Sequence, residues 1–177
     1  MQGYDFAKMN ITKKNFEVNT TMIYRKARFC DTESIYNLIS IYAKNGEMLA
    51  RSRNALYENL RDFIVAEDED GEVVGVGGLH ITWDALAEIC SMAVAPEAIR
   101  QGIGTGIVNE LLKEGKVLGV KTYFTLTYKP KFFASLGFEV VAKDKLPYKI
   151  WKDCIDCPKF PDCDEIAMIL KSTDLCK

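Results

Sequence analysis

The chain has 177 residues, of which 48% are hydrophobic and 27% are charged, and its 23 basic and 25 acidic residues give a formal net charge of -2. This length suits one domain with a sizeable core, and the balanced charge excludes the large basic surface that makes nucleic acid a default partner. No stretch approaches the roughly 18 consecutive apolar residues of a membrane span, so we expect no membrane attachment and a small-molecule partner.

Residues 1–20 show neither a strand period nor a helix period, and they carry no signal-peptide pattern. We interpret them as an arm, part of which could derive from an expression vector, and expect a single domain over residues 21–177 in the cytoplasm. In that reducing compartment, cysteines are better interpreted as thiols or metal ligands than as a disulfide framework. The sequence allows a homodimer but does not fix the oligomeric state.

The first half of the domain predicts a strand, two helices and a hairpin. The expected elements are a strand at residues 22–28, a helix between Asp31 and Gly46, a helix at about 53–60, and strands at 63–67 and 73–81. The last two strands are joined by Asp68-Glu69-Asp70-Gly71, an acidic turn ending in glycine that is typical of hairpins. We therefore expect these two strands to pair antiparallel.

The second half alternates strands with helices. The expected elements are a strand at residues 87–95, a helix at 104–118, a strand at 121–127, a short helix at 130–136, a strand at 138–142 and, within a segment rich in Cys and Pro at 145–177, a last strand at 165–170. Strand, helix and strand following a run of hairpins indicate an α/β fold with a mixed sheet whose second half is parallel.

A glycine-rich loop joins the strand at 87–95 to the helix at 104–118. Gly102, Gly104 and Gly106 lie where free helical amides and the positive end of the helix dipole converge, which favours an anion. The loop lacks the Lys-Ser or Lys-Thr of a Walker motif, and the next strand lacks the acidic residue of a Rossmann site. The remaining interpretations are a pyrophosphate-binding loop or a tight strand-to-helix turn.

Two motifs carry a family resemblance. The first is Glu88-Ile-Cys-Ser-Met-Ala-Val followed by Arg100-Gln-Gly-Ile-Gly, and the second is Phe132-Phe-Ala-Ser-Leu-Gly-Phe. Together with the order of expected elements over residues 22–142, they resemble the GCN5-related N-acetyltransferase (GNAT) superfamily. The resemblance implies acetyl-CoA as co-substrate and a GNAT fold, in which two parallel strands of a mixed sheet splay apart and helices cover both faces.

A narrower resemblance extends into the C-terminal segment. The stretches "MLARS" at residues 48–52, "LYENLRDF" at 56–63, "AEICSMAV" at 87–94 and "LPYKIWKDCIDCPKFPDCDEIAM" at 146–168 are similar to the short, single-domain N-acetylglutamate synthases of bacterial arginine biosynthesis. This resemblance implies N-acetylation of the α-amino group of an amino acid, with L-glutamate favoured. Two alternatives stay open: acetylation of another small amine or a protein N-terminus, and a non-catalytic acetyl-CoA-binding module.

The chain departs from the family pattern at four positions. Ile99 stands where Gln or Arg is usual, Ala50 where Pro is usual, Cys90 where Arg is usual and Phe133 where many relatives have Tyr. The resemblance implies that the change at Ile99 has little consequence, because main-chain amides hold the phosphates in that family. Cys90 removes an arginine that could bind a substrate carboxylate, and Phe133 cannot protonate a leaving thiolate.

The resemblance also implies which residues bind the donor. The pantetheine arm would lie along Met92, Ala93 and Val94, where main-chain amides also point at the thioester oxygen. The pyrophosphate would rest on the loop and the start of the helix, which comprise Arg100, Gln101, Gly102, Ile103, Gly104 and Thr105.

Three further residues are candidates for catalysis and acceptor binding. Glu88 occupies the position of the general base in the histone-acetylating branch, and its alternative is a salt-bridged strand residue. Tyr128 is the nearest candidate to protonate the leaving thiolate, with a packed tyrosine as the alternative. Arg51 is best placed to bind a substrate carboxylate, with a surface arginine as the alternative. The only histidine, His80, is expected to be a satisfied packing residue rather than a base.

The C-terminal segment contains a cysteine pattern. Cys154, Cys157 and Cys163 form C-x2-C-x5-C, which has the compact first half of a zinc knuckle. A fourth thiolate or histidine is not evident, although Cys176, Asp164 or water could complete a site. We therefore expect simple thiols or an adventitious disulfide here rather than structural zinc. Acetyl transfer from a thioester needs no Lewis acid, so no catalytic metal is expected.

Overall fold

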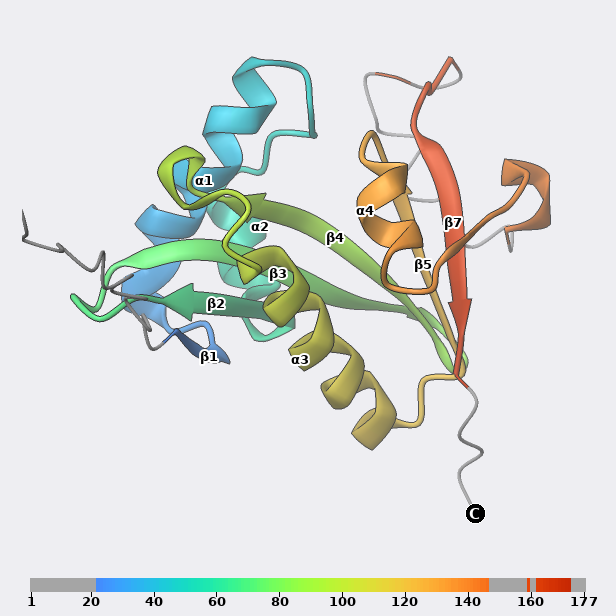
Figure 1. Ribbon diagram of the computed structural model, residues 1–177, viewed down its shortest axis with the longest axis horizontal. Helices are drawn as coiled ribbons and strands as arrows, with labels where there is room; N and C mark the ends of the chain where they lie inside the picture. Colours follow the sequence, from blue (N-terminus) through green and yellow to red (C-terminus); the bar gives the residue numbers. More distant parts are fainter. Residues whose placement is uncertain (1–21, 147–158, 160–161, 173–177) are drawn as a thin grey trace, which may run out of the picture.

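A mixed sheet of seven strands runs through the protein in the order β1-β2-β3-β4-β5-β7-β6 (Figure 1). The fold is known from a computed structural model, which describes residues 22–146, 159 and 162–172. The strands are β1 (Ile23–Lys26), β2 (Phe63–Glu67), β3 (Val73–Trp83), β4 (Leu86–Val94), β5 (Thr122–Thr127), β6 (Glu139–Val140) and β7 (Ile166–Lys171). The helices are α1 (Thr32–Lys44), α2 (Arg53–Glu58), α3 (Ile103–Leu118) and α4 (Pro130–Ala134), with short 3-10 turns η1 (Phe29–Asp31), η2 (Leu60–Asp62), η3 (Pro96–Ala98) and η4 (Lys143–Lys145).

The first four strands form an antiparallel ladder, as the hairpin pattern predicts. β2 has the predicted bounds and pairs with β3 across the acidic turn. The Asp68 Oδ1 accepts a hydrogen bond from the Glu72 amide at 2.9 Å, and Gly71 has a φ of 82° that glycine adopts without strain. β3 then pairs with β4 over almost the full length of both strands.

The prediction that the second half of the sheet is parallel is wrong. Among the described strands, β4 and β5 alone pair in parallel. β7, which comes last in the sequence, enters between β5 and β6 and pairs antiparallel with both. The strand, helix and strand of β5, α4 and β6 have the spacing of parallel neighbours, but local spacing cannot show that a distant strand takes the place between them. β5 and β6 therefore run in the same direction without pairing with each other.

Helices cover both faces of the sheet, as the resemblance implies. Figure 1 shows α3 on one face and α1 with α2 on the other. α1 buries Ile35, Leu38 and Ile39, and α3 buries Ile107 and Leu111, which are the apolar positions at helical spacing. Among the described residues, no helix has the length and apolar character needed to cross a membrane.

α1 is fixed to β1 by an ion-pair network at its first turn. Asp31 stands at the N-cap as predicted, but its carboxylate does not bond the first amides of the helix. Instead it accepts hydrogen bonds from both terminal nitrogens of Arg25, at 2.7 and 3.0 Å, and from the Arg28 amide at 2.6 Å. The Arg25 guanidinium lowers the pKa of Asp31 and also pairs with Glu67. This network holds α1, which contributes Tyr42 to the lining of the cleft described below, against the sheet.

Candidate active site

The two parallel strands of the sheet separate after a short stretch of pairing. β4 and β5 are in register from Leu86 and Thr122 to Glu88 and Phe124, where their pairing ends. A cavity of about 1000 Å³ opens beyond this point. Its walls come from β4, β5, the loop between α1 and α2, the start of α3, and α4. The splay that the resemblance implies is therefore present, with Glu88 at its vertex.

A β-bulge at Ser91 places the side chains of Cys90 and Met92, which are two positions apart on β4, on opposite faces of the sheet. The register with β3 shifts beside Gly78, and Ser91 has a φ of 53°. The Cys90 thiol lies beside Gly78, whereas the Met92 thioether lies beside Gly77 under α3. Without an extra residue in the strand, Cys90 and Met92 would share one face. The bulge thus gives the two walls of the cleft different side chains.

The start of α3 presents main-chain amides to the cleft. The N-cap residue Gly102 has a φ of 81° and Arg100 a φ of 67°, so the chain turns sharply just before the helix. The Gly106 amide bonds back to the Gly102 carbonyl at 2.9 Å. The preceding amides in the first turn have no partner within the helix. The cleft is lined here by Arg100, Gly102, Ile103, Gly104 and Thr105.

Glycine is needed at different positions of this loop for different physical reasons. A Cβ on Gly104 would first meet Phe132, at 3.3 Å, and both residues line the cleft. A Cβ on Gly106 would collide with the ring of Tyr24, so that glycine lets β1 approach the helix. The sequence pattern treats the three glycines alike, but only Gly102 and Gly104 belong to the cleft.

Charged side chains gather at the vertex of the splay. The Nδ1 of His80 on β3 lies 2.7 Å from Oδ2 of Asp62 in η2, and His80 is the cross-strand partner of Glu88. Burial raises the pKa of the Cys90 thiol to about 12, with the Glu88 carboxylate adding to this shift and the Arg51 guanidinium opposing it. This shift favours the thiol form of Cys90 over the nucleophilic thiolate. All five residues line the cleft.

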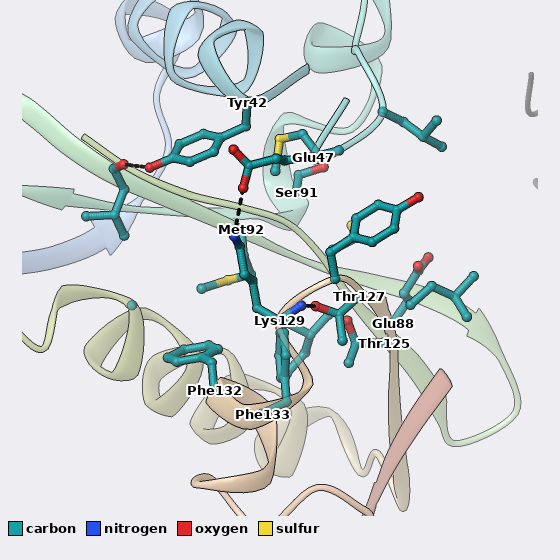
Figure 2. A pocket seen from close by; sticks show the side chains of 18 of the residues that line it. Tyr42, Glu47, Glu88, Ser91, Met92, Thr125, Thr127, Lys129, Phe132 and Phe133 are labelled. Carbon is teal, nitrogen blue, oxygen red and sulfur yellow. Dashed lines mark hydrogen bonds and ion pairs between the residues drawn. The ribbon is translucent and has the colours of Figure 1, made fainter. Parts of the chain in front are cut away.

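Three polar contacts fix α1, the loop after it and the two strands of the splay (Figure 2). The Lys129 ammonium, which follows β5, pairs with the Glu47 carboxylate at 2.7 Å, in the loop after α1. The Lys129 amide donates to the Thr127 hydroxyl at 2.9 Å. On the β4 arm, the Tyr42 hydroxyl donates to the Val94 carbonyl at 2.5 Å. These contacts connect both arms of the splay to α1 and the loop that follows it.

The residues before β7 form a further wall. The Tyr128 hydroxyl donates to Asp164 and accepts from Lys159, and burial raises its pKa, with Asp164 adding to the shift. The pKa of Glu165 is also raised, mainly by burial. The Cys163 thiol donates to Glu165 at 3.7 Å. Tyr128, Cys163 and Glu165 line the cleft.

The structure brings most of the predicted site residues into this one cleft. Its lining includes Arg51, Glu88, Met92, Val94, Arg100, Gly102, Ile103, Gly104, Thr105 and Tyr128. Ala93 is buried and Gln101 is exposed, and neither residue belongs to the lining of the cavity. Cys154 and Cys157 lie outside the described residues. Across the part of the chain that is described, no group of three or more His, Cys, Asp and Glu side chains suits a metal ion.

Sequence reasoning missed several groups that the fold places in the cleft. His80 was expected as a packing residue, yet it is 38% exposed and held by Asp62. Lys129 and Glu47 are 82 positions apart, so no local pattern could join them. Alternation along β3 and β4 could have indicated that His80 and Glu88 share a face, once their register was known.

Comparisons with known proteins agree with this geometry. A model of the acetyltransferase (GNAT) family matches residues 30–138. An uncharacterized N-acetyltransferase of Chlorobaculum tepidum is 40% identical over 145 residues, which are 82% of this chain and 93% of that protein. The amino-acid acetyltransferase of Mycobacterium tuberculosis is 40% identical over 118 residues, or 66% of this chain and 67% of that protein.

A solved structure shows the same architecture with a ligand. The N-acetylglutamate synthase from Neisseria gonorrhoeae, complexed with coenzyme A and N-acetyl-glutamate, matches with a TM-score of 0.78 and 25% identity. The match covers 85% of this chain but only 35% of the Neisseria protein. The present chain is therefore similar to about a third of that synthase.

Proposed function

The chain belongs to the acetyltransferase (GNAT) family, and we propose that it transfers the acetyl group of acetyl-CoA to the α-amino group of an amino acid, with L-glutamate as the favoured acceptor. The family makes it an acetyl-CoA-dependent N-acetyltransferase. The observation that carries the finer proposal is the cleft itself, in which Arg51 and Glu88 lie together beyond the amide-rich start of α3. The similarity to an amino-acid acetyltransferase and an N-acetylglutamate synthase supports the same acceptor class.

The donor half of the cleft fits acetyl-CoA. Amides in the first turn of α3 lack helical partners, and Gly104 leaves them uncovered, so they suit a pyrophosphate, with Arg100 beside them. The edge of β4 that faces the gap, at Met92 and Val94, is free of β5 and can bind an extended amide-bearing chain as a strand would. Acetyl-CoA supplies the activated acetyl group. The β4 amides near Met92 are the proposed donors to the thioester oxygen as its charge develops.

Acetyl transfer then requires a neutral amine and a departing thiolate. Glu88 is proposed to take a proton from the acceptor ammonium, directly or through one water. Tyr128 is proposed to protonate the thiolate, because it lines the cleft and its hydroxyl contacts Lys159, which can supply a replacement proton. A thiol of ordinary pKa, about 8.5, can also leave as the thiolate, so this step depends less on its residue than amine deprotonation does.

Arg51 is the proposed contact for an acceptor carboxylate, and Arg51→Gln should raise the KM for the amino acid about 10-fold or more while the KM for acetyl-CoA changes little. A guanidinium binds a carboxylate through paired charged hydrogen bonds, which a neutral amide replaces poorly. Steady-state kinetics with each substrate varied separately measure both values. Arg53→Gln is the matched control, because Arg53 lies two positions away on α2, outside the cleft, and pairs with Glu33. Equal effects of the two substitutions would remove Arg51 from acceptor binding.

The acceptor is identified by the release of CoA thiol from acetyl-CoA in the presence of a panel of amines. The panel contains L-glutamate, L-glutamine, L-aspartate, neutral amino acids, polyamines and a short peptide with a free N-terminus. We expect the highest kcat/KM with L-glutamate, which would support a role in arginine biosynthesis. Turnover with the peptide or a polyamine alone would replace the proposed acceptor class. Absence of turnover on every amine would favour a non-catalytic binder and contradict the proposal.

We also propose the bounds of the catalytic domain. We take residues 21–177 as one catalytic domain, because the C-terminal segment supplies β7 to the sheet and Cys163 and Glu165 to the cleft. The arm at residues 1–20, a cytoplasmic location and a homodimer stay predictions from the sequence.

A further inference from the structure

The acceptor half of the cleft contains a histidine-carboxylate pair that the proposed reaction does not yet use. His80 is the one histidine of the sequence. Its Nδ1 lies 2.7 Å from Oδ2 of Asp62, which belongs to the 3-10 turn just before β2. Both side chains line the same cavity as Glu88. Arg51 and Cys90 line the same cavity.

The contact with Asp62 selects one tautomer of the imidazole. A carboxylate only accepts hydrogen bonds, so the hydrogen in this contact belongs to Nδ1 of His80. In a neutral ring with its hydrogen on Nδ1, the lone pair is on Nε2. Asp62 therefore fixes both the orientation of the ring and the nitrogen that can receive a proton.

His80 lies directly across the β3-β4 ladder from Glu88. The two residues are cross-strand partners in the β3-β4 ladder, so their side chains leave the same face of the sheet. Directly opposed residues of an antiparallel pair have Cβ atoms about 4.5–5.5 Å apart. His80 is 38% exposed, so its ring also reaches solvent. A proton on the vertex carboxylate thus has a basic group beside it that communicates with bulk water.

We propose that His80, oriented by Asp62, receives through Nε2 the proton that Glu88 removes from the acceptor ammonium, and then releases it to solvent. The N–H bond of the ammonium breaks as Glu88 takes the proton. The carboxyl O–H of Glu88 then breaks as the proton moves to Nε2, directly or through one water. The imidazolium loses it to bulk water, so both residues return to their starting state. The inference rests on the proposed function only in that an amine is acetylated, whatever its identity.

There is a chemical reason for a second proton acceptor after Glu88. Acetylation of an ammonium by a thioester that leaves as a thiol releases one proton per turnover. An ordinary glutamate titrates near about 4.3 and an ordinary imidazole near about 6.5, so the imidazole is the stronger base by a factor of about 10². Passing the proton onward to an imidazole therefore makes deprotonation of the amine less unfavourable at neutral pH.

The kinetic test compares His80→Gln and His80→Ala with wild type on whichever acceptor the panel identifies. We expect kcat near pH 7 to fall about 10- to 100-fold, with CoA affinity within about twofold of wild type. The loss should shrink as pH rises, because more of the amine is already neutral. Added imidazole should restore part of the activity of His80→Ala.

The control is Ile81→Thr, the next residue on β3, which is 50% exposed and lies outside the cleft. It should leave kcat unchanged. An unchanged kcat in His80→Gln would overturn the proton path. A loss that neither imidazole nor higher pH relieves would also overturn it, since His80 would then only shape the cleft.

A second measurement needs no turnover, so it separates failure of the proton path from failure of the proposed acceptor. The untagged protein should give one histidine signal set in a 15N-resolved NMR spectrum, because His80 has no counterpart in the sequence. We expect the tautomer with hydrogen on Nδ1, and a lower titration midpoint in Asp62→Asn because the carboxylate favours the imidazolium. The opposite tautomer, or a midpoint indifferent to Asp62→Asn, would contradict the inference.

Discussion

Glu88→Gln is expected to lower kcat about 10²- to 10⁴-fold near neutral pH while leaving the affinity for CoA nearly unchanged. Glu88 is the last β4 residue that pairs with β5, so its side chain stands where the cleft begins. Glutamine keeps the size of the side chain and some of its hydrogen bonds, but it cannot accept a proton from an ammonium. The loss should become smaller at higher pH, where a larger fraction of the acceptor is already neutral.

The matched control for this substitution is Glu139→Gln. Glu139 is an exposed residue of β6 and does not line the cleft, so the same chemical change there should leave kcat within about twofold of wild type. Initial rates over a pH series, together with a CoA titration followed by fluorescence or calorimetry, measure both quantities. If Glu88→Gln kept the wild-type pH profile, Glu88 would have no part in proton transfer.

Local pattern was enough to predict most of the fold. The strands of the β2-β3 hairpin follow from alternation and an acidic turn closed by Gly71, and α3 follows from the spacing of Ile107, Val108 and Leu111. The splay of β4 and β5 came from a resemblance rather than from periodicity. The insertion of β7 between β5 and β6 was missed, because antiparallel pairing with the end of the chain is a long-range choice with no signature in either strand.

The site residues also fall into those that local sequence could predict and those that only the fold brings together. Residues that lie close together in the chain, such as Arg100, Gly102 and Thr105, were predicted together and line the cleft together. Pairs formed by the fold, such as Asp62 with His80, could not be predicted, because each residue alone has an ordinary surface or packing interpretation. The bulge at Ser91 was equally hidden, since a serine in a strand gives no indication that its φ will be 53°. Chemistry concentrated in one loop is visible in a sequence, and chemistry assembled across strands needs the register.

Gly104→Val is expected to weaken the binding of CoA about 10- to 100-fold without unfolding the protein. Gly104 lies in the first turn of α3 and lines the cleft, and a Cβ there would stand 3.3 Å from Phe132. Valine adds two methyl groups to that Cβ, over amides that have no partner in the helix. Losing one hydrogen bond between an amide and a charged phosphate costs about 1.5–3 kcal/mol, which corresponds to a loss of roughly 10- to 100-fold in affinity.

Two control variants distinguish blocked phosphate-binding amides at the start of α3 from general damage to the helix. Asn109→Val places the same β-branched side chain on an exposed position of α3 away from the cleft, so any general cost to the helix appears there too, without an effect on CoA. Gly104→Ala adds the Cβ alone and should fall between wild type and valine. Because glycine is itself a poor helix former, both Gly104 variants should unfold at a temperature no lower than wild type if the loop exists to hold an anion. Unaltered CoA affinity in Gly104→Val would instead mean that the loop is only a turn, and that the donor's phosphates bind elsewhere along the cleft.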